Sequence, residues 1–177
     1  MRAGAGSGER QGQPVELYLV RHAHAGDPAR WSGDDAARPL SGKGRRQAAR
    51  LGELLAAADL RPGAIVSSPK TRARETAEIV AERLGPRVAV TLDARVADRF
   101  DLEALAAIVD EQGRPPQVVV VGHDPDLSDL VAALVGVEFL PMRKGALARV
   151  DVAGFPSPGA GLLHWFISPD LYLGSDD

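Results

Sequence analysis

The sequence lacks cysteine, and it also lacks any long hydrophobic run. The cysteine count is 0, so neither disulfide bonds nor thiol chemistry can take part in stability or catalysis. This fits a reducing compartment, and we expect a cytoplasmic protein. The longest apolar run is far shorter than the roughly 20 residues that a membrane-spanning helix needs, and the N-terminus has no apolar stretch typical of a signal peptide. We therefore expect no membrane partner.

The chain also lacks a dominant charge. Its 21 basic and 24 acidic side chains give a formal net charge of −3, so no overall basic field would attract nucleic acid. Hydrophobic residues make up 45% and charged residues 25% of the composition, which is typical of a soluble globular protein. A length of 177 residues fits one domain that can bury a core. Nothing in the sequence requires more than a monomer.

Residues 1–14 differ in composition from the rest of the chain. They are rich in glycine, with serine, glutamine and arginine, a composition that disfavours burial and indicates a flexible leader. The remainder shows no internal repeat and no boundary to a second domain. We therefore expect a flexible N-terminal leader over residues 1–14 and one folded domain over residues 15–177.

Short apolar runs typical of strands alternate with segments of helical periodicity. The predicted strands are 15–20, 64–67, 88–90, 117–121, 146–152 and 162–167, and the predicted helices are 42–58, 71–84, 102–109 and 127–135. Residues 25–40 are polar, contain prolines and glycines, and are expected to form a loop. This alternation indicates an α/β fold, a three-layer α/β/α sandwich around a mostly parallel open sheet. The last two strands are expected at a sheet edge.

Histidines and arginines follow the predicted strands at the point where each strand ends. Arg21 and His22 come directly after the first strand, and His123 follows the strand 117–121. Arg72 lies in the first turn of the helix after the second strand. Ligands of such sheets bind beyond the carboxyl ends of the strands. A lone histidine is usually a structural residue, but two at matching strand ends with arginines alongside predict a functional site.

This set of side chains suits the chemistry of phosphate. Arginine forks pair with phosphate oxygens and stay charged at any working pH, and a helix N-terminus adds backbone donors for an anion. A neutral imidazole nitrogen can attack phosphorus and form a phosphohistidine, which divides a difficult transfer into two easier ones. Phosphoryl transfer mainly requires in-line positioning and neutralised charge. One nucleophilic histidine, two arginines and a second histidine would meet this requirement.

These residues resemble a known family, the histidine phosphatases, also called the phosphoglycerate mutase-like superfamily. Four segments carry the resemblance in order: LVRHAHA (19–25), RPLSGKGRRQA (38–48), SSPKTRARETA (67–77) and VVVVGHDPDLS (118–128). They span most of the chain from residue 15 to about residue 134. Within the superfamily, the short chain, the RHA triplet and the GHDPDLS segment are most similar to the SixA-type phosphohistidine phosphatases.

The resemblance implies a role for each of these residues. His22 would be the phosphorylated nucleophile, Arg21 and Arg72 would bind phosphate, and His123 would complete the pocket. The implied fold is phosphoglycerate mutase-like. The implied reaction is hydrolysis of phosphohistidine in proteins through a covalent phosphohistidine on the enzyme, without a cofactor or a metal ion. The expected partner is a phosphorylated protein or a small phosphorylated metabolite.

The chain departs from the family pattern at two points. Ala23 stands where the commonest family motif has glycine, and its methyl group matters only if the backbone needs a positive φ there. Larger members also place a glutamate after a middle strand to protonate an alcohol leaving group, and this chain has no room for that insertion. Asp98 falls near the expected place and Asp124 directly follows His123, so the general acid is Asp98, Asp124 or none. Asp98 can equally be a solvated loop carboxylate, and for Asp124 we expect a role at the helix start.

The missing glutamate bears on the substrate. Expelling an alkoxide needs a proton donor, whereas a phosphoramidate with a protonated ring leaves as neutral imidazole, so phosphohistidine is favoured. Two alternatives stay open, a phosphatase of small phosphomonoesters that uses Asp98 or Asp124, and a phospho-ligand binding module without turnover. His24 and His22 form an HxH pair, but no carboxylate or third histidine has suitable spacing for a metal site.

Overall fold

A single mixed sheet forms the centre of the fold in a computed structural model that describes residues 14–85 and 89–173. Its strands lie in the order β3-β2-β4-β1-β5-β6. The first four in this order are mutually parallel, and β5 and β6 are antiparallel additions at one edge. The strand bounds are β1 (Val15–Arg21), β2 (Ala64–Ser67), β3 (Val90–Leu92), β4 (Gln117–Gly122), β5 (Leu147–Val152) and β6 (Gly161–Ile167).

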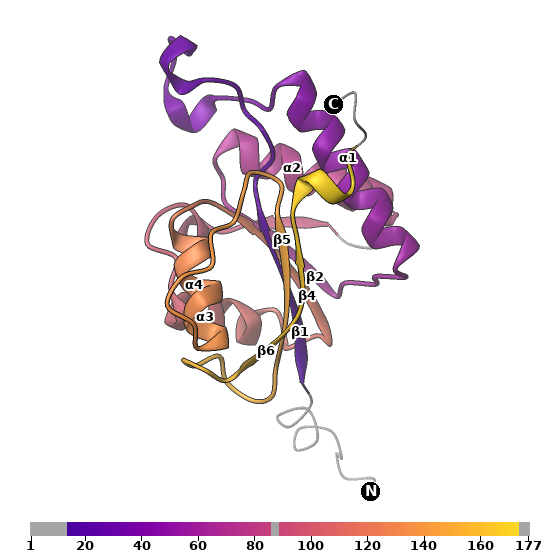
Figure 1. The fold of residues 1–177 in the computed structure, drawn as a ribbon, viewed down its shortest axis with the longest axis vertical. Coiled ribbons are helices and arrows are strands. Elements are labelled where there is room, and N and C mark those ends of the chain that lie inside the picture. The colour runs from indigo at the N-terminus through magenta and orange to yellow at the C-terminus, as the bar shows by residue number, and fades with distance from the viewer. Residues whose placement is uncertain (1–13, 86–88, 174–177) are drawn as a thin grey trace, which may run out of the picture.

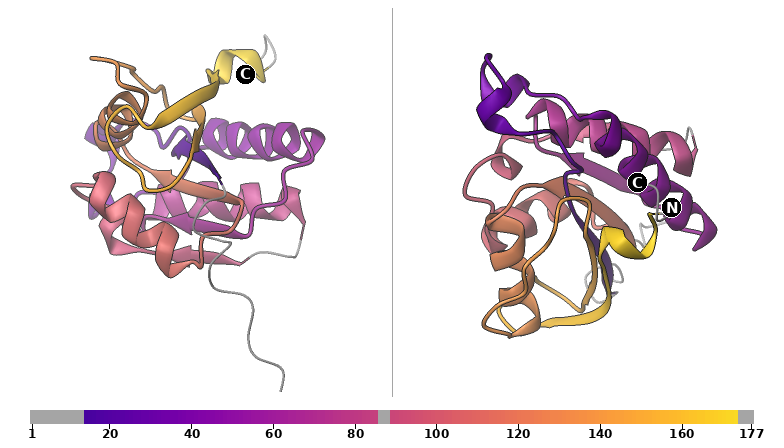
Figure 2. Two further views of the ribbon diagram at one scale, coloured as in Figure 1. Left: turned by 90° about the horizontal axis from the view of Figure 1, so that it is seen from below. Right: turned by 45° about the horizontal axis from the view of Figure 1, so that its top comes forward.

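Helices cover both faces of this sheet. One pair, α1 and α2, packs on one face, and a second pair, α3 and α4, packs on the other (Figures 1 and 2). The helix bounds are α1 (Gly42–Ala57), α2 (Thr71–Leu84), α3 (Leu102–Glu111) and α4 (Asp126–Val135). The predicted three-layer α/β/α sandwich with a mostly parallel sheet is confirmed.

Alternate residues of each central strand supply the two cores. In β1, Leu17 and Leu19 belong to the core shared with α3 and α4, whereas Tyr18 and Val20 belong to the core shared with α1 and α2. Successive side chains of a strand point to opposite faces of a sheet, so a strand that is covered on both faces is apolar throughout. The strand β4 is buried in the same way. The core therefore fixes the central strands firmly, including their ends.

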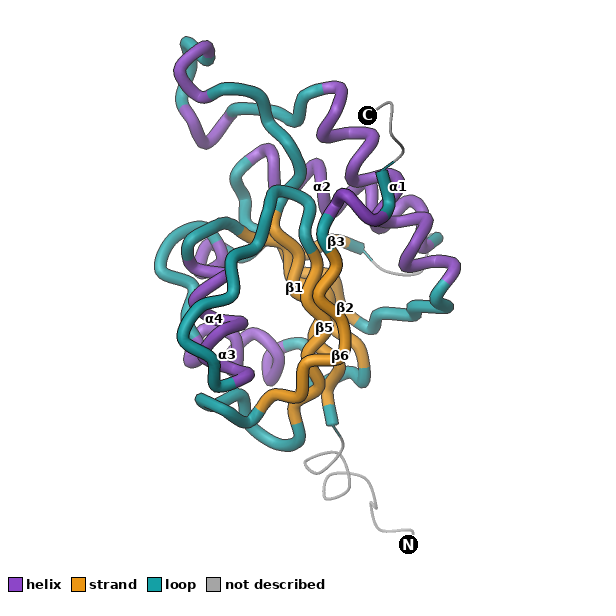
Figure 3. Tube along the Cα trace, viewed as in Figure 1, coloured by secondary structure: helices purple, strands orange, loops and turns teal. Residues whose placement is uncertain are grey.

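Most element boundaries match the prediction, and the differences are at edges and loops. The edge strand was predicted over 88–90, of which residue 88 lies outside the described residues, and the strand occupies Val90–Leu92 instead. Thr91 and Leu92 are exposed at this edge, so no buried apolar pattern marks the strand. The predicted loop over residues 25–40 contains two short 3₁₀ helices, η2 (Pro28–Arg30) and η3 (Asp35–Ala37) (Figure 3).

Residues 1–13 of the predicted leader lie outside the described residues, so the leader and the domain start at residue 15 stay predictions. Among the helices of residues 14–85 and 89–173, none has the length and apolar character needed to cross a membrane.

Candidate active site

The sheet itself brings the two predicted histidines together. Arg21 pairs with Gly122 in the parallel register of β1 and β4, and the His22 N–H donates to the Gly122 carbonyl at 3.0 Å. His22 and His123 therefore follow neighbouring parallel strands at the same end of the sheet, the carboxyl end of those strands. Their ring centroids are 5.1 Å apart, with 56° between the ring planes.

His22 presents one defined ring nitrogen for chemistry. Its Nδ1 lies 2.7 Å from the carbonyl oxygen of Ala23. Because a carbonyl can only accept, Nδ1 must carry the proton and donate it. The lone pair of a neutral ring is then on Nε2. The backbone thus sets the tautomer in which Nε2 is the nucleophilic atom.

The surroundings of His22 keep this ring uncharged. The side chain is buried, with 6% of the residue exposed. Burial lowers the pKa of His22 to about 3, and the nearby charges of Arg72 and Arg21 act in the same direction. A neutral imidazole retains the lone pair that nucleophilic attack requires.

His123 is held by a serine from the loop after β2. The Ser68 hydroxyl lies 2.7 Å from His123 Nε2 and accepts a hydrogen bond from the Lys70 N–H at 3.2 Å. No other acceptor is present for the Ser68 proton among the described residues, so the hydroxyl donates to Nε2 and the ring proton is on Nδ1. Burial lowers the pKa of His123 to about 3, aided by the charge of Arg72. This ring is therefore a neutral donor through Nδ1.

Arg21 extends from the end of β1 into the same region. Its Nη1 donates to the Met142 carbonyl at 2.5 Å and lies 3.2 Å from Oδ2 of Asp124. Its Nε is buried and has no hydrogen-bond partner among the described residues. The two contacts hold Nη1 of the guanidinium, and Nε remains without a partner in the described part of the chain.

Arg72 reaches the site from the first turn of α2. Like Arg21, it has contacts at its terminal guanidinium nitrogens and none at Nε among the described residues. Nη1 donates to the backbone oxygen of Asp35 at 2.7 Å, and Nη2 lies 3.1 Å from Oδ2 of the same residue. Its Nε is buried and unpartnered. Burial lowers the pKa of Arg72, but a guanidinium stays protonated at any working pH.

Three buried donors on residues near His22 have no hydrogen-bond partner among the described residues. Five buried side-chain nitrogen or oxygen atoms lack a hydrogen-bond partner within the described part of the chain, and three of them are Arg21 Nε, Arg72 Nε and His123 Nδ1. Such atoms are costly unless a ligand or water satisfies them. All three are N–H donors on residues that surround His22. The arrangement suits an oxyanion with several acceptor oxygens, as phosphate has.

Asp98 lies at the rim and is held as a carboxylate. Its Oδ1 accepts from Lys70 Nζ at 2.8 Å, and 78% of the Asp98 side chain is exposed. The hydrogen bond and charge of Lys70 lower the pKa of Asp98, with smaller contributions from His123 and Arg72. Asp98 is therefore close enough to influence the site, but it is ionised and lacks a proton to donate.

Asp124 does not have the expected role at the helix start. The helix α4 begins at Asp126 without a side-chain cap. The Asp124 carboxylate instead accepts from the Ser128 hydroxyl at 2.6 Å and pairs with Arg21. Asp124 therefore contacts the first turn of α4 through Ser128 but does not cap the helix backbone. Its pair with Arg21 joins residues about a hundred positions apart, which local sequence cannot reveal.

Ala23 and His24 directly follow His22 beyond the end of β1. Ala23 is buried and is not among the described residues with a positive φ, so a side chain is accommodated where the family motif has glycine. His24 contacts the start of α1. Its ring Nδ1 lies 2.7 Å from the Ser41 hydroxyl, and its backbone N–H donates to Oε1 of Gln47 at 2.8 Å. Within residues 14–85 and 89–173, no group of three histidine, cysteine, aspartate or glutamate side chains is placed to hold a metal ion.

Two further cations near the site were missed by the sequence analysis. Arg38 is buried and donates from Nη1 to the Ala25 carbonyl at 2.7 Å. Lys144 lies in the loop before β5, and burial together with the charges of Arg21, Arg38 and Arg72 lowers its pKa. Arg38 stood inside a quoted motif, and the motif gave no reason to single it out. For Lys144 no local signal existed, because it approaches the site through the antiparallel strand β5.

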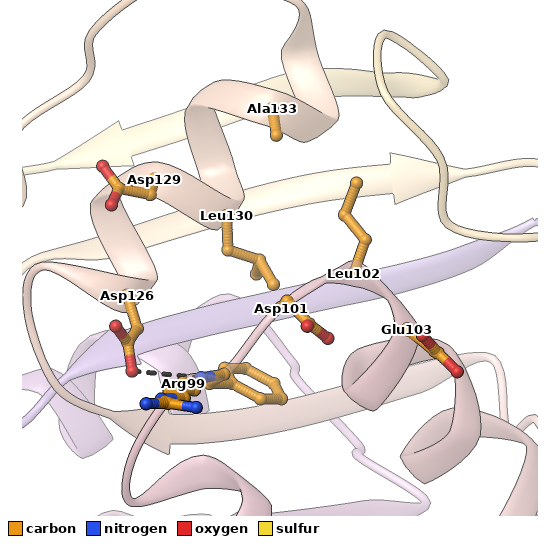
Figure 4. Close-up of a pocket in the computed structure, with 9 residues that line it drawn as sticks. Arg99, Asp101, Leu102, Glu103, Asp126, Asp129, Leu130 and Ala133 are labelled. Carbon is orange, nitrogen blue, oxygen red and sulfur yellow. Dashed lines mark hydrogen bonds between the residues drawn. The ribbon is translucent and has the colours of Figure 1, made fainter.

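A separate cavity lies away from these cations, between the start of α3 and the first turns of α4 (Figure 4). Its volume is about 530 Å³. The apolar side chains of Leu102, Leu130 and Ala133 line part of it, and most of its charged lining residues are acidic. Carboxylates repel a dianion, so this cavity is not suited to phosphate. The position that suits phosphate is instead beside His22, at the carboxyl end of β1.

Comparisons with known proteins identify the family of the chain. The family model of the histidine phosphatase superfamily (branch 1) matches residues 17–103. An uncharacterised protein of a Picosynechococcus strain is 37% identical over 123 residues, which cover 68% of this chain and 73% of that protein. The chain belongs to the histidine phosphatase superfamily, and it is accordingly a phosphatase, a hydrolase of phosphorylated compounds.

Solved structures show the same fold. The protein histidine phosphatase SixA, in a complex with tungstate, superimposes with a TM-score of 0.76 at 24% identity over 89% of this chain and 99% of that chain. A mycobacterial glucosyl-3-phosphoglycerate phosphatase superimposes with a TM-score of 0.64 at 20% identity, over 88% of this chain and 100% of that chain. At these identities the similarity establishes the fold, and a fold of this kind serves more than one phosphorylated substrate.

Proposed function

We propose that the protein hydrolyses phosphohistidine in proteins through a covalent phosphohistidine at His22. The observation that carries the proposal is the set of unpartnered N–H donors, Arg21 Nε, Arg72 Nε and His123 Nδ1, around a neutral histidine. Three donors can hold the equatorial oxygens of a phosphoryl group while Nε2 of His22 faces phosphorus. The SixA structure described above, a protein histidine phosphatase with bound tungstate, supports the same use of this fold.

The reaction has two steps. In the first, the lone pair of His22 Nε2 forms a bond to phosphorus as the P–N bond of the substrate breaks. The substrate imidazole takes up the electron pair of that bond and leaves as a neutral ring, because its other nitrogen is already protonated. In the second, water attacks phosphorus, the Nε2–P bond breaks, and inorganic phosphate is released. Nδ1 of His22 keeps its hydrogen bond to Ala23 throughout.

The ionised state of Asp98 favours phosphohistidine over an alkyl phosphate. An alkoxide leaving group needs a proton at the moment when its bond to phosphorus breaks. Asp98 is paired with Lys70 and its pKa is lowered, and Asp124 is engaged by Arg21 and Ser128. Asp98 is therefore a carboxylate near neutral pH and has no proton to give. A leaving group that departs as neutral imidazole requires none.

A comparison of two substrate classes tests the proposal. Purified wild type and Asp98→Asn are assayed on a phosphohistidine-bearing protein and on simple alkyl phosphates. We expect kcat/KM to be far higher for the phosphohistidine protein, and we expect Asp98→Asn to change that value little. Asp101→Asn is a matched control, because Asp101 caps α3 and, among the described residues, its side chain accepts only from the Ala104 N–H.

The opposite pattern would contradict the substrate assignment. A wild type that prefers alkyl phosphates, together with a large loss confined to those substrates in Asp98→Asn, would make Asp98 the general acid of a phosphomonoesterase. No turnover of either class, with retained phosphate binding, would indicate a binding module.

A further inference from the structure

Asp35, like Asp98 and Asp124, is an acidic residue that pairs with a cation of the site. It belongs to η3 in the connection between β1 and α1, which projects beyond the end of the sheet (Figures 1 and 3). Although 56% of its side chain is exposed, Asp35 contacts Arg72, whose side chain is only 8% exposed. An outlying loop therefore reaches back to one of the arginines that face the phosphate position.

The contacts of Asp35 occupy one end of the Arg72 guanidinium. The backbone oxygen accepts from Nη1 at 2.7 Å, and Oδ2 lies 3.1 Å from Nη2. A guanidinium has five N–H donors in a rigid plane, and fixing its two terminal nitrogens fixes the direction of the remaining edge. That edge contains Nε, which is buried without a partner. The geometry leaves a pre-oriented donor edge.

Arg38 fixes Asp35 from the other side. Nε of Arg38 donates to Oδ1 of Asp35 at 2.8 Å, and Nη1 of Arg38 donates to the Ala25 carbonyl at 2.7 Å. Both oxygens of the carboxylate are thus engaged by arginines. The negative charge between Arg38 and Arg72 also reduces their mutual repulsion.

The geometry points to Asp35 as a positioning residue that holds Arg72 with its Nε edge toward the phosphoryl group. This inference rests on the proposed function only in that Arg72 binds phosphate. A competing interpretation has Asp35 occupy Arg72 as an internal anion that the substrate must displace. The two interpretations predict opposite changes in oxyanion affinity when the Asp35 carboxylate is removed. Removing a positioning contact weakens oxyanion binding, whereas removing a competing negative charge strengthens it.

The test measures binding of inorganic phosphate and of tungstate by calorimetry to wild type, Asp35→Asn and Asp35→Ala. We expect both variants to bind each oxyanion about tenfold more weakly, because a misdirected donor loses most of its contribution. We also expect KM to rise by a similar factor while kcat falls less. Asp34→Asn is the matched control, since Asp34 lies in the same loop and its side chain accepts only from the Ala36 N–H within the part of the chain that the structure describes. Thermal unfolding establishes that the variants are folded.

Several results would overturn the inference. Tighter binding by Asp35→Asn would make Asp35 a competing anion, and unchanged binding would remove it from the site altogether. Arg72→Lys separates this failure from failure of the site. If wild type binds neither oxyanion, or if Arg72→Lys binds both as well as wild type, then the phosphate pocket itself is wrong. If Arg72→Lys loses binding and Asp35→Asn does not, only the role of Asp35 is wrong.

Discussion

His22 and His123 are neutral bases placed among cations. Burial is the main reason that the pKa of each ring falls to about 3. Water solvates an imidazolium well and the protein interior does not, and the neighbouring arginines add repulsion. The same positive charges that would hold a phosphoryl dianion thus also preserve the nucleophile. Binding and activation depend on one set of residues.

Stability should therefore fall as the solution becomes acidic. Each histidine has a pKa near 3 in the folded state and an ordinary value of 6.5, so the unfolded chain takes up more protons between these values. The contribution of the two histidines to the free energy of unfolding is complete above about pH 6.5 and is lost as the pH falls toward 3. Around pH 5 each ring adds up to about 1.4 kcal/mol per pH unit to the slope of unfolding free energy.

Urea unfolding between pH 4 and pH 8 measures this slope. We expect His22→Asn to show a shallower dependence than wild type, by close to one proton near pH 5. His164→Asn is the control, since His164 lies on β6 with 39% of its side chain exposed. Equal slopes for wild type and His22→Asn would mean that His22 titrates normally in the folded protein. In the same range, kcat/KM should show no ionisation of His22 near pH 6.5.

At the scale of elements, the start of α1 supports the segment that follows His22. Ser41 caps α1 by accepting from the Gly44 N–H at 3.1 Å, and the Ser41 N–H donates to the His24 carbonyl at 3.0 Å. Gly44 lies against the same carbonyl, and a Cβ at this position would be 1.9 Å from the His24 oxygen. The RPLSGKG segment therefore packs against the backbone of the segment that follows His22.

Gly44→Ala should damage both stability and activity. The clash is with backbone, so the helix or the His24 segment must move, and we expect a loss of about 1–3 kcal/mol with reduced turnover. Gly42→Ala is the control, because its nearest contact would be an ordinary 3.8 Å to Arg46. Denaturant unfolding and kcat measure the two effects. A Gly44→Ala protein as stable and active as Gly42→Ala would contradict the packing described.

The elements also show what sequence can predict. Apolar runs at 15–20 and 117–121 predicted β1 and β4, and because parallel strands end together, they placed His22 and His123 at one edge. The edge strand β3 was displaced because an exposed strand has little pattern. Asp35, Arg38 and Lys144 were not identified because their place depends on loops and on an antiparallel strand. Such contacts join segments whose local sequence carries no signal of the partner.

At the scale of the whole molecule, the charge of the site is opposite in sign to the net charge of the chain. The chain has a net charge of −3, yet Arg21, Arg38, Arg72 and Lys144 influence one another at one edge of the sheet. These residues come from the end of β1, the connection between β1 and α1, the first turn of α2 and the loop before β5. The net charge excludes an overall basic field, while the strand ends predicted two arginines of this basic site and the fold adds Arg38 and Lys144.

The most direct test of the account is to trap the phosphoenzyme. Wild type is mixed briefly with a labelled phosphodonor, quenched in alkali, and digested for mass spectrometry. The account predicts an acid-labile phosphate on His22, with no label and turnover lowered by roughly 10⁴-fold or more in a folded His22→Ala, while His164→Ala labels like wild type. Turnover without label on His22, or a folded His22→Ala that hydrolyses substrate at the wild-type rate, would contradict it.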